Sequence, residues 1–181
     1  MNPVVAQILA LFRTRGHSQY GGEAVTQLQH ALQCATLARK EGAPAALITA
    51  ALLHDIGHLL HDLPENAPDN GIDDLHEDRA AAFLQTYFRA DVVEPVRLHV
   101  AAKRYLCAIE PDYLRALSTP SLHSLTLQGG PMNPTEIAAF EALPHAASAV
   151  RLRRWDDRAK DPECHTEPVE AFAAIIASTL K

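Results

Sequence analysis

Helix signals recur along the whole chain, because apolar residues follow one another at intervals of three and four, and no long alternating strand pattern occurs. Asn2 and Pro3 form a helix start, and the apolar positions after them predict a helix that ends near Gly16. The same spacing predicts further helices over residues 23–40, 44–60, 75–88, 91–109, 111–117, 120–127, from 133 onward, 144–158 and 168–180. No repeat, low-complexity tract or linker interrupts them. We therefore expect an all-α fold with a single domain over residues 1–181.

The stretch ALLHDIGHLLHD, residues 51–62, places polar groups inside the most apolar of these predicted helices. An unpaired imidazole or carboxylate buried in such a helix costs several kcal/mol. His54, Asp55 and His58 are therefore expected to be paired or to hold a metal ion. In one continuous helix, His54 and His58 lie one turn apart and Asp55 lies three residues before His58, so an imidazole and a carboxylate can face the same point.

Other predicted helices carry further candidate ligands close to apolar residues that would turn them inward: His30, His76, His99 and Asp156. A single histidine beside an apolar face is more often a hydrogen-bonded core residue than a ligand. Several helices that each contribute one inward histidine or carboxylate, however, are how helix bundles build metal sites. Imidazoles and carboxylates without a thiolate suit iron, manganese, cobalt, nickel or zinc better than magnesium or calcium, and they do not separate iron from manganese. The ligand number leaves coordination positions open, which indicates a catalytic site.

Charge and cysteine usage narrow the classes of partner. The formal net charge of −6 argues against a general nucleic-acid or membrane surface. The three cysteines form no CxxC pair or disulfide framework, and the N-terminus lacks a basic region with a cleavage site, so we expect a cytoplasmic protein. The longest apolar run, residues 43–60, contains charged positions and predicts a core helix, not a membrane span. A small-molecule substrate fits these features, and the sequence indicates no protein partner.

The ordered pattern H…HD…H…H…D resembles the HD-domain superfamily, a helical bundle built around a His-Asp metal site. That resemblance implies the ligand set His30, His54, Asp55, His76, His99 and Asp156. It also implies a dinuclear site, because His76 and His99 provide ligands for a second ion. Asp55 is then the natural bridge, since its two oxygens can serve two ions about 3.5–4 Å apart.

Four local blocks resemble a narrower group, the mixed-valent diiron oxygenases of the phosphonate-cleaving (PhnZ/TmpB-like) branch, and more distantly myo-inositol oxygenase. The blocks are YGGEAVTQLQHALQCA at residues 20–35, HVAAKRYL at 99–106, LQGGPM at 127–132 and RRWDDRAK at 153–160. The resemblance implies two iron ions in the Fe(II)/Fe(III) state, with O₂ as co-substrate. The implied reaction is cleavage of the C–P bond of a 1-hydroxyphosphonate to phosphate and a carboxylate. The product would be glycine from 1-hydroxy-2-aminoethylphosphonate, or glycine betaine from its N-trimethyl analogue.

Four residues are candidates for substrate contact. Lys103 lies one turn after His99 and could neutralise a phosphonate oxygen. His58 could donate a hydrogen bond at the edge of the metal pair, and Arg153 places a second cation one turn before Asp156. The alternative for Lys103 and Arg153 is a solvated helix face. Gln128, before Gly129 and Gly130, is expected in a substrate-facing turn, although the same residues could simply end a helix.

The segment SQYGGEA places a tyrosine before two glycines, whose backbone freedom suits a loop that moves or approaches a site closely. The resemblance implies that Tyr20 occupies a metal position when substrate is absent, and that Glu23 helps it to switch. The alternative is a plain surface turn. For the whole chain, the rival hypotheses are a metal-dependent HD phosphohydrolase acting on a nucleotide or small phosphate ester, and a non-catalytic ligand-binding domain.

Overall fold

The structure, a computed structural model, describes residues 2–61 and 74–181. Over these residues all regular structure is helical, and two isolated β-bridges, Gln19 with Thr26 and Phe88 with Leu180, are the remaining backbone pairings of strand type. The predicted all-α class is thereby confirmed. The helices are α1 (Pro3–Arg15), α2 (Gln27–Lys40), α3 (Ala45–Leu53), η1 (Ile56–Leu59), α4 (His76–Leu84), α5 (Ala90–Ile109), α6 (Pro111–Ala116), α7 (Thr119–Leu127), α8 (Pro134–Glu141), α9 (Ala146–Arg158), η3 (Val169–Phe172) and α10 (Ala173–Ser178).

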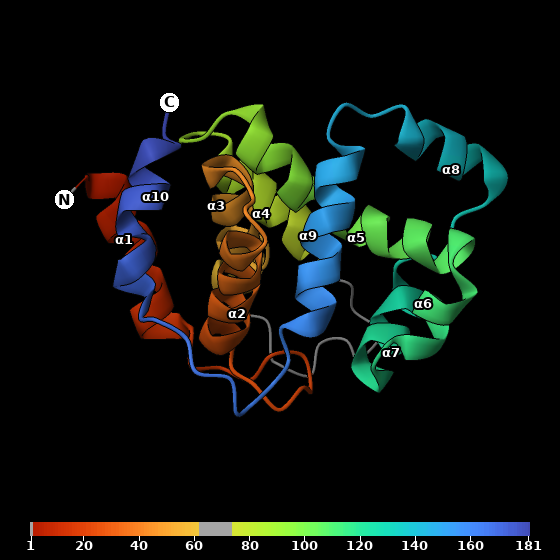
Figure 1. The fold of residues 1–181 in the computed structure, drawn as a ribbon, viewed down its shortest axis with the longest axis horizontal. Helices are drawn as coiled ribbons and strands as arrows, with labels where there is room; N and C mark the ends of the chain where they lie inside the picture. The colour runs from red at the N-terminus through yellow and green to blue at the C-terminus, as the bar shows by residue number, and fades with distance from the viewer. Residues whose placement is uncertain (1, 62–73) are drawn as a thin grey trace.

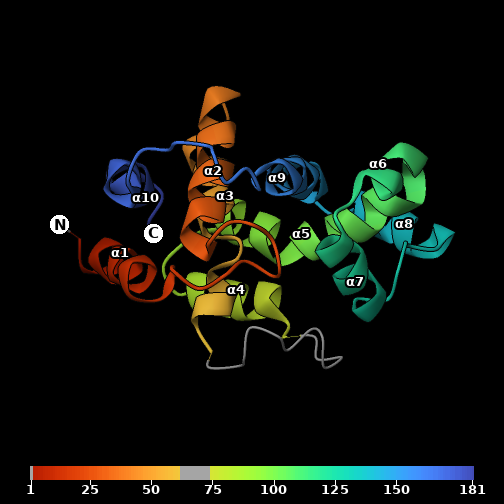
Figure 2. The ribbon, with the colours of Figure 1, turned by 90° about the horizontal axis from the view of Figure 1, so that it is seen from below.

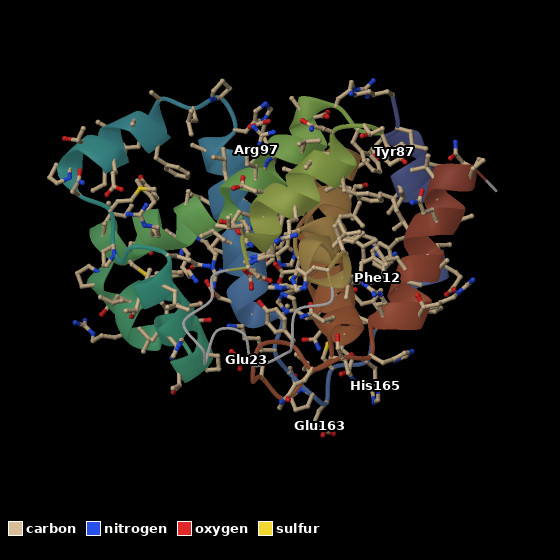
Figure 3. All side chains as sticks on the ribbon, turned by 180° about the vertical axis from the view of Figure 1, so that it is seen from behind. Phe12, Glu23, Tyr87, Arg97, Glu163 and His165 are labelled. Atoms are coloured by element: carbon tan, nitrogen blue, oxygen red, sulfur yellow. The ribbon has the colours of Figure 1, made fainter. Side chains whose placement is uncertain are left out.

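The helices form a central bundle with a smaller group at each end. Helices α1 and α10 lie together at one end, α2, α3, α4, α5 and α9 occupy the middle, and α6, α7 and α8 lie at the other end (Figures 1 and 2). The main hydrophobic core fills the first end and the middle, where Phe12 of α1 points into the bundle (Figure 3). A smaller core around Phe140 and Ala149 joins α8 to α5 and α9. Among the described residues, no helix is both long and apolar enough to cross a membrane.

Several helices begin where their capping residues predict. The Asn2 side chain accepts a hydrogen bond from the Val4 N–H, and Asn133 forms a capping box with Glu136. The second helix begins at Gln27, so the predicted start near residue 23 was wrong. Thr26 caps this helix, and its extended backbone pairs with Gln19 instead of continuing a helix towards the N-terminus.

The third helix is shorter than the sequence predicts, because α3 ends at Leu53 and does not continue through residue 60. His54 is its C-terminal cap, Asp55 leaves the helical conformation at φ −100° and ψ 11°, and a 3₁₀ turn follows. At Gly57 a Cβ atom would lie 1.9 Å from the backbone oxygen of His76. The chain therefore turns here with α4 pressed directly against its backbone, an approach that only glycine permits.

The last predicted helix, residues 168–180, is also broken: a 3₁₀ turn, η3, precedes the short α10. The stretch PENAPDNGIDD, residues 64–74, whose turn-forming composition predicts a surface loop, lies outside the described residues except for Asp74. Pro95 is accommodated inside α5, which runs unbroken from Ala90 to Ile109. This long helix spans the middle of the molecule and the α6–α8 end, so it connects the main core to the elements that border the site (Figure 2).

Candidate metal centre and adjoining cavity

The six predicted ligands meet in the middle of the bundle, although they come from five separate elements. His30 lies on α2, His54 and Asp55 follow α3, His76 begins α4, His99 lies on α5 and Asp156 lies on α9: all six are buried. They fall into two sets of facing atoms. We call His30, His54, Asp55 and Asp156 the first set, and Asp55, His76 and His99 the second set.

In the first set the ligand atoms lie within a few ångströms of one another. The Nε2 atoms of His30 and His54 are 3.1 Å apart, and Asp55 Oδ2 lies 3.4 Å and 3.1 Å from them. Asp156 Oδ1 lies 3.5 Å from His30 Nε2. The four side chains thus point their coordinating atoms at a common position.

The second set repeats this arrangement around the other oxygen of Asp55. His76 Nε2 and His99 Nε2 are 3.1 Å apart, and Asp55 Oδ1 lies 3.4 Å and 3.3 Å from them. One carboxylate therefore faces both pairs of histidines, with one oxygen toward each. Asp55 is thus placed to face two ions, and the bridging role that the HD-domain resemblance implies for it stays a prediction.

The contacts of the outer ring nitrogens show which atom of each histidine faces the centre. The Nδ1 atoms of His30, His54 and His99 lie 2.8, 2.9 and 2.7 Å from the backbone oxygens of Ala159, Ala51 and Val96. A carbonyl oxygen only accepts, so each of these Nδ1 atoms carries a proton, and Nε2 is the ring nitrogen that faces the centre.

Two Nε2 atoms 3.1 Å apart need either a proton shared between them or a positive ion beside them. Asp55 Oδ1, moreover, is buried with no hydrogen-bond donor. A buried carboxylate oxygen without a donor is costly unless it is paired or coordinates a metal. The residues present therefore fit two metal ions.

Charge around the centre is balanced chiefly by Arg153. Its Nη1 lies 2.7 Å from Asp156 Oδ2, and it also pairs with Asp157. Burial alone would raise the pKa of Asp156, but the Arg153 guanidinium and the nearby imidazoles outweigh it and hold that pKa well below its usual range. Asp156 thus remains an anionic ligand, and much of the Arg153 charge is already used in holding it.

A cavity of about 280 Å³ opens directly beside the two sets. It exposes Asp55, His76, His99 and Asp156 from the centre. It is also lined by every residue predicted to contact substrate or to control access: Tyr20, Glu23, His58, Lys103, Gln128 and Arg153. The structure thus gathers the predicted substrate and access residues around one cavity that adjoins the predicted ligands. Their individual roles stay predictions.

Lys103 and Gln128 are the polar groups of the cavity wall most ready for a ligand. Lys103 is only 2 % exposed, which excludes the solvated helix face, and its Nζ donates to Ser124 Oγ at 2.8 Å. Burial, with the Arg153 guanidinium nearby, lowers the pKa of Lys103 to about 7. The Oε1 atom of Gln128 is buried without a hydrogen-bond partner. The Lys103 ammonium would be stabilised by an anionic ligand, and Gln128 Oε1 could accept a hydrogen bond from a ligand hydroxyl.

The loop between α1 and α2 covers the first set. The ring of Tyr20 stacks on His30, with 3.7 Å between centroids, and its hydroxyl donates to Asp156 Oδ1 at 3.2 Å. Tyr20 is thus no plain surface residue. Glu23, labelled in Figure 3, accepts from Ser118 Oγ at 2.5 Å and lies 3.2 Å from Lys160 Nζ. These contacts tie the loop to α7 and to the segment after α9.

Sequence reasoning missed three features near the cavity. Asp74 contacts three histidines, including the ligand His76. Lys160 neutralises Glu23. Ser118, Ser121 and Ser124 form a row that holds both lysines. The three-residue spacing of the serines marks one helix face and could have been found, whereas the contacts of Asp74 and Lys160 depend on the fold.

Comparison with known proteins agrees with this geometry. Residues 27–136 match the HD domain family. The chain is 49% identical over 180 residues to a hydroxymethylphosphonate dioxygenase of Gimesia maris, covering 98% of this chain and 88% of that protein. It is 41% identical over 173 residues to the glycine-betaine-forming [1-hydroxy-2-(trimethylamino)ethyl]phosphonate dioxygenase of Leisingera caerulea, covering 96% and 88%. The chain therefore belongs to the HD-domain family and, within it, to the same group as these hydroxyphosphonate dioxygenases.

Proposed function

We propose that the protein is an O₂-dependent dioxygenase that cleaves the C–P bond of a 1-hydroxyphosphonate. The observation that carries the proposal is the pair of histidine sets sharing Asp55, placed beside a cavity that contains the buried Lys103. The activities for which the two relatives are named support the same reaction class. The rival phosphohydrolase would need the same metals and no O₂.

The proposed cofactor is a pair of iron ions in the Fe(II)/Fe(III) state, held by the two sets of ligands. When bound, such ions activate O₂ and polarise an oxygen ligand of the substrate. Imidazole and carboxylate ligands suit iron, and the relatives' names support the use of O₂. Iron in preference to manganese rests on the resemblance to mixed-valent oxygenases, and elemental analysis decides it.

The chain's own residues would orient the substrate. A phosphonate oxygen is expected on Lys103, whose ammonium is held by Ser124 and gains its proton fully when an anion lies beside it. The unpartnered Oε1 of Gln128 is suited to accept from the substrate hydroxyl. His58, stacked on His76 with 4.1 Å between ring centroids, lies at the cavity edge, where its Nε2 can donate to a second phosphonate oxygen when the ring carries both protons.

The overall reaction balances without a further reductant. A 1-hydroxyphosphonate dianion and O₂ give a carboxylate, hydrogen phosphate and one proton. The C–H and C–P bonds of C1 break, and both oxygen atoms of O₂ enter the products. All four electrons that reduce O₂ come from the substrate.

The substituent on C1 is the part of the substrate still to be identified. The resemblance to the phosphonate-cleaving oxygenases implies an aminoethyl or trimethylaminoethyl compound, and the name of one relative adds hydroxymethylphosphonate, which has no nitrogen. Glu23 would attract a cationic group, but Lys160 already lies 3.2 Å from its carboxylate. Comparing kcat/KM for the three compounds shows how strongly the Glu23 carboxylate still attracts a cationic substituent.

The test is phosphate release from these three compounds, with and without air, by protein that has been analysed for iron. The proposal requires phosphate only in air, with one O₂ consumed for each phosphate. Phosphate from a nucleotide or simple phosphate ester without O₂ would establish the hydrolase instead. No turnover of any of them by iron-loaded protein would favour a ligand-binding domain.

We propose, in addition, that Tyr20 controls access of O₂ to the centre. Its hydroxyl lies 3.2 Å from the ligand atom Asp156 Oδ1, and its ring lies flat on His30. Gly21 and Gly22, which follow Tyr20, have φ values of 47° and 83°, in the left-handed region that favours glycine. A shift of this loop would move the hydroxyl onto or away from the first set.

A further inference from the structure

Asp74, which precedes α4, makes an unusual number of contacts for one carboxylate. Its Oδ1 lies 3.0 Å from His76 Nδ1 and accepts from the His76 backbone N–H at 3.3 Å. Its Oδ2 lies 2.6 Å from His58 Nδ1 and 3.0 Å from His61 Nε2. Asp74 thus joins a predicted metal ligand to a residue that lines the cavity.

These contacts decide which nitrogen each ring offers. A carboxylate only accepts, so the Nδ1 atoms of His76 and His58 carry protons that point at Asp74. His76 is left with Nε2 as its coordinating atom, which is the atom that faces Asp55 and His99. His58 is left with Nε2 for a partner in the cavity that it lines.

The two rings are also held parallel. His58 and His76 stack with 4.1 Å between centroids and 19° between planes, so neither ring can turn without disturbing the other. Between Asp74 and His76, Leu75 has φ 50°, a conformation that costs a leucine about 1–2 kcal/mol. That turn lets residues two apart in sequence bring their side chains together.

We propose that Asp74 is a positioning residue that holds the ligand His76 and the cavity residue His58 in one arrangement, so that the second set and the substrate-facing wall are built as a unit. The proposal rests on the proposed function for its substrate half, whereas its metal half stands on geometry alone. Burial would raise the pKa of Asp74, but hydrogen bonds from His58 and His76 outweigh it and keep that pKa well below its usual range.

The decisive variant is Asp74→Asn, which keeps the shape but places one amide NH₂ where an acceptor is needed. It can accept from one histidine and must oppose the N–H of the other. Losing a carboxylate partner of a ligating histidine typically reduces metal affinity or activity about 10- to 100-fold. We therefore expect the holoenzyme to lose one of two ions to a chelator about 10- to 100-fold faster, while the other is released at the wild-type rate.

Two matched variants separate the two halves of the role. His58→Gln should raise KM for the phosphonate and leave metal release unchanged, because His76 keeps its carboxylate. Asp78→Asn makes the same substitution at an exposed position of α4 and should change neither quantity. Unchanged melting temperature in all three variants would show that global stability is not responsible.

Wild-type metal release and KM in Asp74→Asn would overturn the proposal. If that variant fails to fold, Asp74→Glu provides the same test, since a restored carboxylate should rescue metal retention at least in part. A folded Asp74→Glu protein that retains metal no better than an Asp74→Ala protein would also overturn it. Metal release needs no substrate, so this half is decided even if no hydroxyphosphonate is turned over.

Discussion

Replacing Lys103 by methionine removes the one lysine that lines the cavity among the described residues, and it does so with little change in volume. The side chain is 2 % exposed, and burial has lowered its pKa to about 7, so the fold gains little from its charge. Lys103→Met is therefore expected to fold normally and to keep its metal ions. What it loses is the charge-assisted hydrogen bond to a phosphonate oxygen.

The size of that loss can be worked out. A hydrogen bond to a charged group contributes roughly 1.5–3 kcal/mol. Each 1.36 kcal/mol is a factor of ten, so KM should rise roughly 10- to 150-fold. The value of kcat should change much less if Lys103 binds the phosphonate equally in the ground and transition states.

The pH dependence gives a second, independent signature. The Lys103 ammonium is charged below its pKa of about 7 and loses its proton as the pH rises through that value. Because kcat/KM reports the free enzyme, the wild-type value should fall about tenfold for each pH unit well above pH 7. Lys103→Arg stays protonated and should lack this decrease. Titration of the substrate is common to all three proteins, so the comparison between them isolates Lys103.

The assay is phosphate release at saturating O₂, measured from pH 6 to 9 in roughly half-unit steps, with iron content determined for each protein. Lys40→Met, an exposed lysine at the end of α2, is the control and should match wild type throughout. A Lys103→Met enzyme with unchanged KM would refute the assignment. So would a wild-type pH profile that Lys103→Arg reproduces.

Three further substitutions test the centre and its surroundings. Asp55→Ala should lose both ions and all activity, because Asp55 is the residue that faces both sets; retention of two irons per chain would contradict this. Tyr20→Phe removes the hydroxyl 3.2 Å from Asp156 and should bind metal normally, lack any tyrosinate-to-iron absorption and oxidise faster in air. A spectrum and air stability equal to wild type would mean that the loop does not guard the centre. Gly57→Ala places a methyl group 1.9 Å from the His76 backbone oxygen and should cost roughly 1–3 kcal/mol, lowering the melting temperature by several degrees. An unchanged melting temperature would show that the backbone at Gly57 yields easily.

The helical fold class and the candidate ligands could be predicted from the sequence because both leave a local pattern of residue types. Helical spacing and caps such as Asn133 depend on neighbours a few residues away. The ligands stand out because histidine and aspartate are rarely placed among apolar residues without a reason. His30 and His99, one on each of two separate helices, were assigned through the ordered pattern that resembles the HD-domain superfamily, and the fold places both beside the predicted partners.

The remainder depends on tertiary contacts that no local pattern encodes. The HD motif continues a helical pattern, yet the helix ends at Leu53 because α4 must approach Gly57. Asp74 resembles any other acidic residue of a loop until the fold places it beside three histidines. Arg153 was predicted as a second cation near Asp156, and its ion pairs with Asp156 and Asp157 favour a role in holding that predicted ligand over direct contact with substrate.

The distribution of the ligands along the chain has a consequence for how the centre is assembled during synthesis. Chains emerge from the ribosome starting at the N-terminus. The second set is complete once His99 has emerged, whereas the first set still needs Asp156, 57 positions further on, and the Ala159 carbonyl that orients His30. A nascent or truncated chain that ends before α9 therefore carries every residue of the second set but lacks one residue of the first set. Completion of α9 supplies the last residue of the proposed dinuclear centre.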